Sequence, residues 1–241
     1  RGGARGRGPL VLPAVWRAPP ELGAVGALSM EALAAHCGDT AMTVLRSAPM
    51  RGTDAVDGAL MHRANLWQLC EYACGRSPPL CPLCFANPNC VWRAFGWRPW
   101  EGQPPERQGF GAALQALPAW RPDFADAVEG LENAEAEAAG AALDLEPPGA
   151  VTRLHRPAAH LLVVVLSGEK DFLLFPPEDS AALRPGLGTC DPEQSACDPL
   201  DPAELQRLQR AGAVPQAATL AAGDGLLVPG GWWCWARARA P

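Results

Sequence analysis

Two apolar runs separated by a short polar turn decide the fold of this chain: Leu161-Leu-Val-Val-Val-Leu166 and Asp171-Phe-Leu-Leu-Phe175. The first run is short, continuous and followed by Ser-Gly, which is typical of a β-strand buried on both faces. The second run follows at hairpin distance and ends at Pro176-Pro177, because proline cannot donate to a sheet. The two runs therefore predict neighbouring strands joined by a tight turn.

Two more strands are expected toward the end of the chain. Gly225-Leu-Leu-Val228 is entered through Ala222-Gly-Asp-Gly225, and Trp232-Trp-Cys-Trp235 begins the last one. We expect Gly223 and Asp224 to form the turn, with positive φ at the glycine and the aspartate bonding local amides. Short antiparallel strands with Pro/Gly corners predict a β-sandwich or a small barrel, which the tandem tryptophans Trp232 and Trp233 should help to fill.

The first half of the chain predicts a mixture of helices and strands. Ser29 is a good N-cap for a helix over residues 29–36, and residues 40–46 are rich in β-formers. Helical spacing of apolar residues predicts a second helix over 59–73, and residues 125–145 suggest a helix with an acidic face. The tryptophans of the intervening region should seal a β-core: Trp92, Trp97, Trp100 and Trp120.

Length and composition favour one globular domain over residues 9–241. Hydrophobic residues make up 48% of the 241 positions, and a net charge of −6 argues against a surface that neutralises a nucleic-acid backbone. The basic arm of residues 1–8, Arg1-Gly-Gly-Ala-Arg-Gly-Arg-Gly8, is expected to be disordered, with RNA or an acidic partner as its possible contact. The sequence contains no uninterrupted apolar stretch of about 18 residues, so it predicts no membrane-spanning helix.

Five of the nine cysteines lie between residues 70 and 90: Cys70, Cys74, Cys81, Cys84 and Cys90. Cys81-Pro-Leu-Cys84 has the spacing of a zinc half-site, but the other three thiols do not form a well-spaced second pair. We therefore predict that this segment carries no stoichiometric zinc, and keep a zinc knuckle as the alternative. Scattered free thiols are typical of a reducing compartment, so the nucleus or the cytoplasm is the expected location.

Five short motifs in the last third of the chain recur in a characteristic order and spacing. They are Thr152-Arg-Leu-His155, Gly168-Glu-Lys170, Leu174-Phe-Pro-Pro177, Leu220-Ala-Ala-Gly-Asp224 and Val228-Pro-Gly-Gly-Trp-Trp-Cys234. In this order they resemble the JmjC-type, cupin-like 2-oxoglutarate oxygenases, the group of the factor-inhibiting-HIF hydroxylase and the Jumonji arginine demethylase/lysyl hydroxylase. Asp198-Pro-Leu-Asp-Pro202 resembles the segment before the family's last metal-bearing strand. The clearest match covers residues 146–241.

The resemblance implies a mainly β fold with added helices. Its core would be a double-stranded β-helix, or jelly roll, preceded by a mixed helical N-terminal part. The mouth of such a roll holds Fe(II) and 2-oxoglutarate. Because the chain starts without Met and stops at Pro241, where the family has one more strand, we expect a fragment truncated at its C-terminus.

The metal positions implied by the resemblance depart from the family pattern. His155 matches the first ligand of the 2-His-1-carboxylate triad, but Pro157 stands where the carboxylate should be and Cys234 where the second histidine should be. Proline offers no side-chain donor, and a thiolate makes a softer site than an iron oxygenase uses. His160 is a possible substitute, although its odd offset from His155 predicts the opposite face of a strand.

The co-substrate positions agree better with the family. Lys170 matches the lysine that pairs with the distal carboxylate of 2-oxoglutarate, and Thr152 matches a threonine that hydrogen-bonds it. A solvated lysine in a turn is the alternative for Lys170. Simple strand alternation would put Thr152 and His155 on opposite faces, so the role of Thr152 rests on the resemblance alone.

Two functions follow from these residues. The chain could be an Fe(II)- and 2-oxoglutarate-dependent oxygenase acting on a protein side chain, with His155 and an unusual set of partners holding the metal. It could instead be a pseudo-oxygenase, in which the jelly roll persists as a binding or scaffolding module for a protein partner. The replacements at positions 157 and 234 favour the second hypothesis, whereas Thr152 and Lys170 favour the first.

Overall fold

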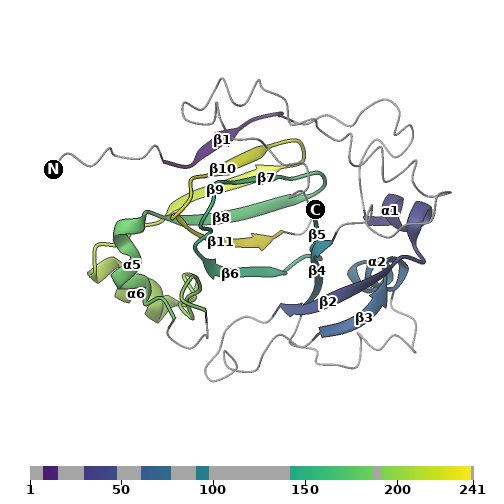
Figure 1. The fold of residues 1–241 in the computed structure, drawn as a ribbon, viewed down its shortest axis with the longest axis horizontal. Helices are drawn as coiled ribbons and strands as arrows, with labels where there is room; N and C mark the ends of the chain where they lie inside the picture. The colour runs from purple at the N-terminus through teal and green to yellow at the C-terminus, as the bar shows by residue number, and fades with distance from the viewer. Residues whose placement is uncertain are drawn as a thin grey trace.

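The computed structural model describes residues 8–15, 30–47, 61–76, 91–97, 142–186 and 191–239, and within them the chain is mainly β with short helices (Figure 1). The elements are β1 (Leu10–Leu12), α1 (Met30–Cys37), β2 (Ala41–Ser47), β3 (Met61–Asn65), α2 (Leu66–Ala73), β4 (Val91–Trp97), β5 (Leu143–Leu145), β6 (Val151–His155), β7 (Leu161–Val164), β8 (Glu169–Phe175), η5 (Pro177–Asp179), α5 (Ser180–Leu183), α6 (Pro202–Arg210), β9 (Gln216–Ala221), β10 (Gly225–Val228) and β11 (Trp233–Ala238). No helix in these ranges is long and apolar enough to cross a membrane.

The C-terminal half forms two antiparallel sheets that share a core. One has the strand order β1-β10-β7 and the other β6-β11-β8-β9 (Figure 1). Phe172 and Leu174 of the larger sheet pack in one buried cluster with Leu226 and Val228 of the smaller sheet. Among the described strands no pair joins the two sheets, so the mainly β architecture is confirmed while closure into a jelly roll stays a prediction.

The larger sheet is buried on its other face as well. Leu154, Phe175, Trp233 and Trp235 alternate with the inward residues and pack against the segment that carries α5 and α6. Trp232 belongs to the core between the sheets, so both tandem tryptophans pack in cores as expected. This alternation places Cys234 on the inner face, between two outward tryptophans.

The predicted hairpin of residues 161–175 is wrong, although both strands exist. β7 pairs with β10, whereas β8 pairs with β9 and β11, so the turn at Gly168 carries the chain from one sheet to the other. Val165 is bound instead to the β9–β10 turn, since its amide donates to the Asp224 carbonyl at 3.0 Å and its carbonyl accepts from the Gly223 amide at 2.7 Å. That long-range pairing outcompetes the local hairpin, and it leaves β7 only partly buried.

The β9–β10 turn itself agrees with the sequence. Gly223 has φ +94°, and the Asp224 carboxylate accepts from the Ala221 amide at 3.1 Å. Asp224 also accepts from the Ala14 amide at 3.0 Å, which ties the segment after β1 to this turn. A residue in the turn between β9 and β10 therefore also anchors the N-terminal strand.

A second four-stranded sheet, β3-β2-β4-β5, forms the N-terminal part together with α1 and α2. Its core includes Val44, Leu66, Leu69 and the fully buried Trp92, which confirms one of the core tryptophans. Trp97 is partly buried against the same core. Trp100, Trp120 and the basic arm through residue 7 lie outside the described residues. The helix expected over residues 29–36 and the strand over 40–46 are confirmed within a residue.

The helices predicted over residues 59–73 and 125–145 are each wrong at one end: the start of the first and the end of the second form strands. Residues 61–65 form β3, and α2 begins only after Asn65, which makes a reciprocal capping box with Gln68. The expected acidic helix ends in a strand, β5, and residues 125–141 lie outside the described part of the chain. In both cases pairing to a neighbouring strand overrides the local helical spacing.

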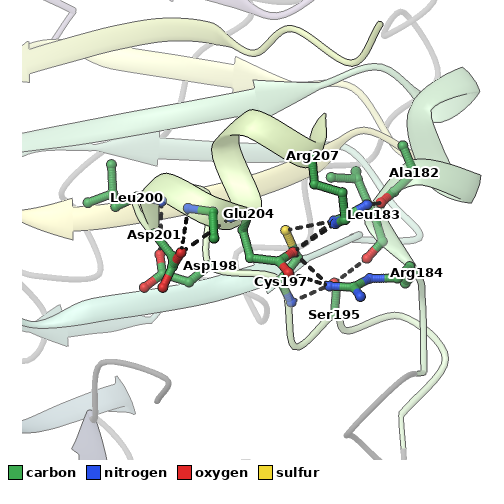
Figure 2. Close-up of polar contacts among 11 residues, drawn as sticks. Ala182, Leu183, Arg184, Ser195, Cys197, Asp198, Leu200, Asp201, Glu204 and Arg207 are labelled. Carbon is green, nitrogen blue, oxygen red and sulfur yellow. Dashed lines mark hydrogen bonds and ion pairs between the residues drawn. The ribbon is translucent and has the colours of Figure 1, made fainter. Parts of the chain in front are cut away.

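The segment resembling the family's DP motif caps and anchors α6 (Figure 2). Asp201 is the N-cap, and its carboxylate accepts from the amides of Ala203 at 2.8 Å and Glu204 at 3.3 Å. Glu204 pairs with Arg184 and Arg207, and Arg207 also donates to the Ala182 carbonyl at 2.6 Å. This network ties α6 to α5 beside the outer core of the larger sheet.

Replacing Asp201 by alanine should lower the free energy of unfolding by about 1 kcal/mol, because two amides of the first turn lose their acceptor. Urea unfolding of Asp201→Ala and Asp201→Asn measures this, since asparagine keeps a capping oxygen. Wild-type stability in the alanine variant, or an equal loss in both variants, would contradict the assigned cap.

Candidate functional site

The predicted site residues lie on the inner face of the larger sheet. Cys234 on β11 is directly opposite His155 on β6 and Leu174 on β8. Lys170 is in phase with the inward-facing Phe172 and Leu174, and its Nζ atom lies 5.7 Å from the centre of the Phe172 ring. The structure therefore brings the metal and co-substrate positions to one face.

A β-bulge in β6 puts Thr152 on that face too. His155 is opposite Cys234 and Thr152 is opposite Ala236, so a three-residue step on β6 matches a two-residue step on β11. The extra residue resets the alternation, as bulges do. The expectation from simple alternation, that Thr152 and His155 face opposite ways, is thus corrected in favour of the position that the resemblance implied.

A carboxylate of the chain itself occupies the place between Thr152 and Lys170. Glu146, just after β5, forms an ion pair with Lys170 through Oε2, and its Oε1 atom accepts from Arg93 Nη1 at 2.6 Å and from Thr152 Oγ1 at 3.1 Å. Arg93 Nη1 also donates to Thr152 Oγ1 at 2.6 Å. We call these four residues, Arg93, Glu146, Thr152 and Lys170, the Glu146 cluster.

The Glu146 cluster is largely shielded from water. The side chain of Glu146 is 7% exposed, and those of Arg93 and Lys170 are each 12% exposed. Lys170, the only lysine of the sequence, is therefore a buried and paired side chain and not a solvated turn residue. Salt and water screen buried ion pairs little, so removing one charged partner leaves the other as a costly unpaired charge.

Charge balance explains why Glu146 stays ionised. Burial is the largest influence and raises the pKa of its carboxyl, but the Lys170 ammonium and the Arg93 guanidinium together outweigh it and hold the pKa below its ordinary value. Asp144 is within electrostatic range of both cations and accepts from the Gly96 amide at 2.8 Å. The cluster thus pairs two cations with one buried carboxylate, and the Asp144 carboxylate lies nearby without an ion pair to either cation among the described contacts.

The neighbouring metal positions do not make an iron centre. Pro157 supplies no side-chain donor, and its carbonyl accepts from the Gly231 amide at 2.8 Å. Cys234 is 2% exposed, and burial raises the pKa of its thiol to about 12, so the thiol is neutral at physiological pH. One thiol and one imidazole fall short of two histidines and a carboxylate.

The two histidines near this position are already engaged. Burial lowers the pKa of His155, and its Nδ1 atom lies 2.9 Å from the carbonyl oxygen of Arg153. The backbone of Cys234 also hydrogen-bonds the His155 imidazole. His160 is exposed, and its Nδ1 atom accepts from the Gly230 amide at 3.2 Å, which matches an ordinary surface histidine. The residues present therefore do not fit Fe(II).

Sequence reasoning missed Glu146 and Arg93. Glu146 stands in Leu145-Glu-Pro-Pro148, which suggested only the end of a helix, and Arg93 comes from a segment that suggested core tryptophans. A charged residue directly between a buried leucine and two prolines is the one local signal for Glu146. Its partners come from β4, β6 and β8, so only the tertiary structure identifies them.

Among the described residues, the group able to offer three metal-ligating atoms lies elsewhere. Glu31, Cys70 and Cys74 place one ligand atom each within 4.8 Å of one another. The thiols of the predicted zinc half-site, Cys81 and Cys84, fall outside the described residues, as does Cys90. Four cysteines whose side chains the structure describes are free thiols: Cys70, Cys74, Cys197 and Cys234.

Comparison with known families adds one finding. The sequence profile of the family described as "Cupin-like domain" matches residues 115–241, more than half of the chain. The match begins before residue 146, where the motif resemblance becomes clear, and it spans the Glu146 cluster except Arg93. No curated protein sequence matches the chain.

Proposed function

The chain belongs to the cupin-like domain family, which includes the JmjC-type 2-oxoglutarate oxygenases, and on this basis we propose that it is a member without oxygenase turnover that serves as a jelly-roll binding or scaffolding module. Such a role uses the fold as a stable frame and presents its surface loops to a partner. An intracellular protein is the partner we propose, and the free thiols of the described residues support a reducing compartment.

One observation carries the proposal: the Glu146 carboxylate binds both Lys170 and Thr152, the two residues that the resemblance assigns to the distal carboxylate of 2-oxoglutarate. A co-substrate would have to displace a buried, doubly charge-paired carboxylate before it could bind. Because a dicarboxylate would gain the same contacts that Glu146 loses, the exchange offers it little net free energy.

The metal position supports the same conclusion. Oxygen activation in this family needs a centre that keeps iron bound through its catalytic cycle, and His155 with a buried Cys234 lacks the carboxylate of the family's triad. An incomplete set of metal ligands, together with a co-substrate position occupied by Glu146, would leave a folded domain that does not catalyse oxygenation.

The competing function is an oxygenase that modifies a protein side chain. The observation in its favour is that Thr152, His155 and Lys170 still share the inner face, through the β6 bulge. For this function Glu146 would have to leave the cluster during each cycle, and the protein would need a metal held by His155 and Cys234.

Purified chain supplied with Fe(II), ascorbate and 2-oxoglutarate should produce no succinate above a protein-free control, and calorimetry should detect no 2-oxoglutarate binding. The reason is that neither the metal nor the co-substrate finds its complete set of partners. Lys170→Ala is the matched variant. Iron-dependent succinate formation by the wild type that disappears in Lys170→Ala would overturn the proposal and make Cys234 a metal ligand.

A further inference from the structure

Three side chains from two helices converge beside the N-terminal sheet, away from the Glu146 cluster. Glu31 lies in the first turn of α1, Cys70 is on α2, and Cys74 is the C-cap of α2. The sulfur atom of Cys74 lies 3.0 Å from Glu31 Oε1, and all three ligand atoms are within 4.8 Å of one another. We propose that Glu31, Cys70 and Cys74 bind a thiophilic divalent cation of the Zn²⁺ class.

The separations of these atoms, 3.0 Å between Cys74 Sγ and Glu31 Oε1 and at most 4.8 Å for the other two pairs, bracket the spacing of tetrahedral coordination. A zinc ion bound about 2.3 Å from sulfur and about 2.1 Å from oxygen needs its ligands roughly 3.5 to 3.8 Å apart. Cys70 and Cys74 are four residues apart, so one turn of α2 directs both thiols to the same side. Three protein ligands leave a fourth position for water.

The surroundings hold the three ligands in place. Cys70 is 1% exposed within the N-terminal core, whereas Cys74 is partly buried and Glu31 is exposed at the rim, so an ion can reach the site from solvent. A backbone hydrogen bond joins the end of α1 to the first turn of α2: the Trp67 amide donates to the Gly38 carbonyl at 2.9 Å. The two helices lie next to one another in Figure 1.

Both thiols are protonated in the metal-free site, because burial raises the pKa of Cys70 to about 12 and the hydrogen bond to Glu31 raises the pKa of Cys74. Metal binding releases the Cys70 and Cys74 protons to solvent, so the ion and its three anionic ligands carry one net negative charge. Arg76 lies close enough to interact with Cys74 and is paired with Glu71 at 3.3 Å. The bound ion would join α1 to α2 and stabilise this part of the fold.

This inference revises the expectation of no stoichiometric zinc. That expectation rested on spacing along the chain, where Cys70 and Cys74 lack a suitable second pair. The third ligand, Glu31, comes from a different helix. Because it is not a cysteine, the spacing of the cysteines along the chain could not reveal it. The proposed site is independent of the zinc knuckle, which would require Cys81 and Cys84.

The test is zinc content and affinity of the full chain, purified after exposure to excess Zn²⁺ and measured by elemental analysis and by competition with a chromogenic chelator. We expect one zinc per chain, and a loss of affinity of at least about tenfold in Glu31→Gln and in Cys74→Ser. Both residues are accessible, so these variants should fold. Cobalt substitution should give thiolate-to-metal absorption in the wild type that weakens in Cys74→Ser.

Two further variants serve as controls. Cys197→Ser removes a buried thiol in the outer core of the larger sheet, and Cys81→Ser with Cys84→Ser removes the alternative half-site. Both should retain the metal. The proposal is overturned by the absence of stoichiometric zinc, by unchanged affinity in Glu31→Gln and Cys74→Ser, or by loss of zinc in the Cys81/Cys84 double variant.

Discussion

Replacing Glu146 by alanine is expected to lower the free energy of unfolding by about 3–5 kcal/mol, the usual cost of removing one partner from a buried ion pair. The change leaves Arg93 and Lys170 facing each other, each with a side chain only 12% exposed. Urea unfolding at neutral pH measures the loss. Glu169→Ala is the matched control, because its pair with Arg239 is nearly half exposed and should contribute less than about 1 kcal/mol.

The effect of Glu146 should depend on pH in a defined direction. Because its pKa is held below the ordinary value in the folded chain, its stabilising contribution is present above the unfolded-state pKa of about 4.3 and is lost as the pH falls through the folded-state pKa. The stability difference between wild type and Glu146→Gln should therefore shrink in acid. A difference that stays constant down to low pH would mean that the charge is not its source.

A dicarboxylate should partly restore the Glu146→Ala variant. Removal of the internal carboxylate leaves Lys170, Thr152 and Arg93 without their acceptor, and succinate or 2-oxoglutarate can supply one. At 100 times its dissociation constant such a ligand adds about 2.7 kcal/mol, which appears as a rise in melting temperature. The wild type should not respond. An unstable variant that gains nothing from either compound would show that the Glu146 cluster is structural only.

Lys170 offers a direct chemical readout of the same change. As the only lysine in the sequence, it can be followed by acetylation with an amine-selective reagent and mass spectrometry, with the N-terminal amine as an internal reference. Lys170 should react slowly in the wild type because it is buried and paired. It should react faster in Glu146→Ala and slow down again when succinate is added.

The second large effect concerns the metal. Pro157→Asp together with Cys234→His should convert a chain that binds Fe(II) weakly into one that binds it at least about 100-fold more tightly, since it restores an anionic ligand and a second imidazole. Calorimetry under anaerobic conditions measures the affinity without any need for activity. Histidine is larger than the buried Cys234, so unfolding measurements should accompany it to detect a packing cost of about 1–3 kcal/mol.

Decarboxylation should require one change more than the metal ligands. Sequence alone predicts uncoupled 2-oxoglutarate decarboxylation in the double variant, but in the structure Glu146 binds Thr152 and Lys170, the residues that the resemblance assigns to the co-substrate. We therefore expect succinate only when Glu146→Ala is added, with 2-oxoglutarate filling the space of the lost side chain. A double variant that already decarboxylates would show that Glu146 yields to the co-substrate. A triple variant that binds iron and 2-oxoglutarate without turnover would show a further defect.

The pattern of residues along the chain was enough to locate the individual strands. It also showed which positions depart from the family's metal-ligand pattern. The runs at 171–175 and 225–228 lie wholly in strands and the run at 161–166 lies in a strand through residue 164, because a strand's own residues set its apolar pattern. Gly223 forms its turn with positive φ for an equally local reason. That Pro157 cannot bind a metal follows from its covalent structure and needs no coordinates.

Helix 59–73 marks where local pattern misled. Apolar spacing continued through residues 61–65, but those residues pair with β2, and the capping box of Asn65 and Gln68 sets the true start of α2. Spacing reports which face of a segment is apolar, whereas strand pairing depends on a partner elsewhere in the chain. The same competition replaced the expected hairpin of β7 and β8 by pairing with β10 and β11.

The sequence by itself thus determined the mainly β character and the family, since these depend on residue identity and near neighbours, and the departure from the family's iron triad at positions 157 and 234 stays a prediction from the resemblance. Only the tertiary structure decided that Thr152 shares a face with His155, that Glu146 lies between Arg93 and Lys170, and that Glu31 meets Cys70. A bulge changes strand phase without a local signature, and an ion pair or metal site joins residues far apart in the chain. Their energies arise only when folding brings the groups together in a water-poor interior.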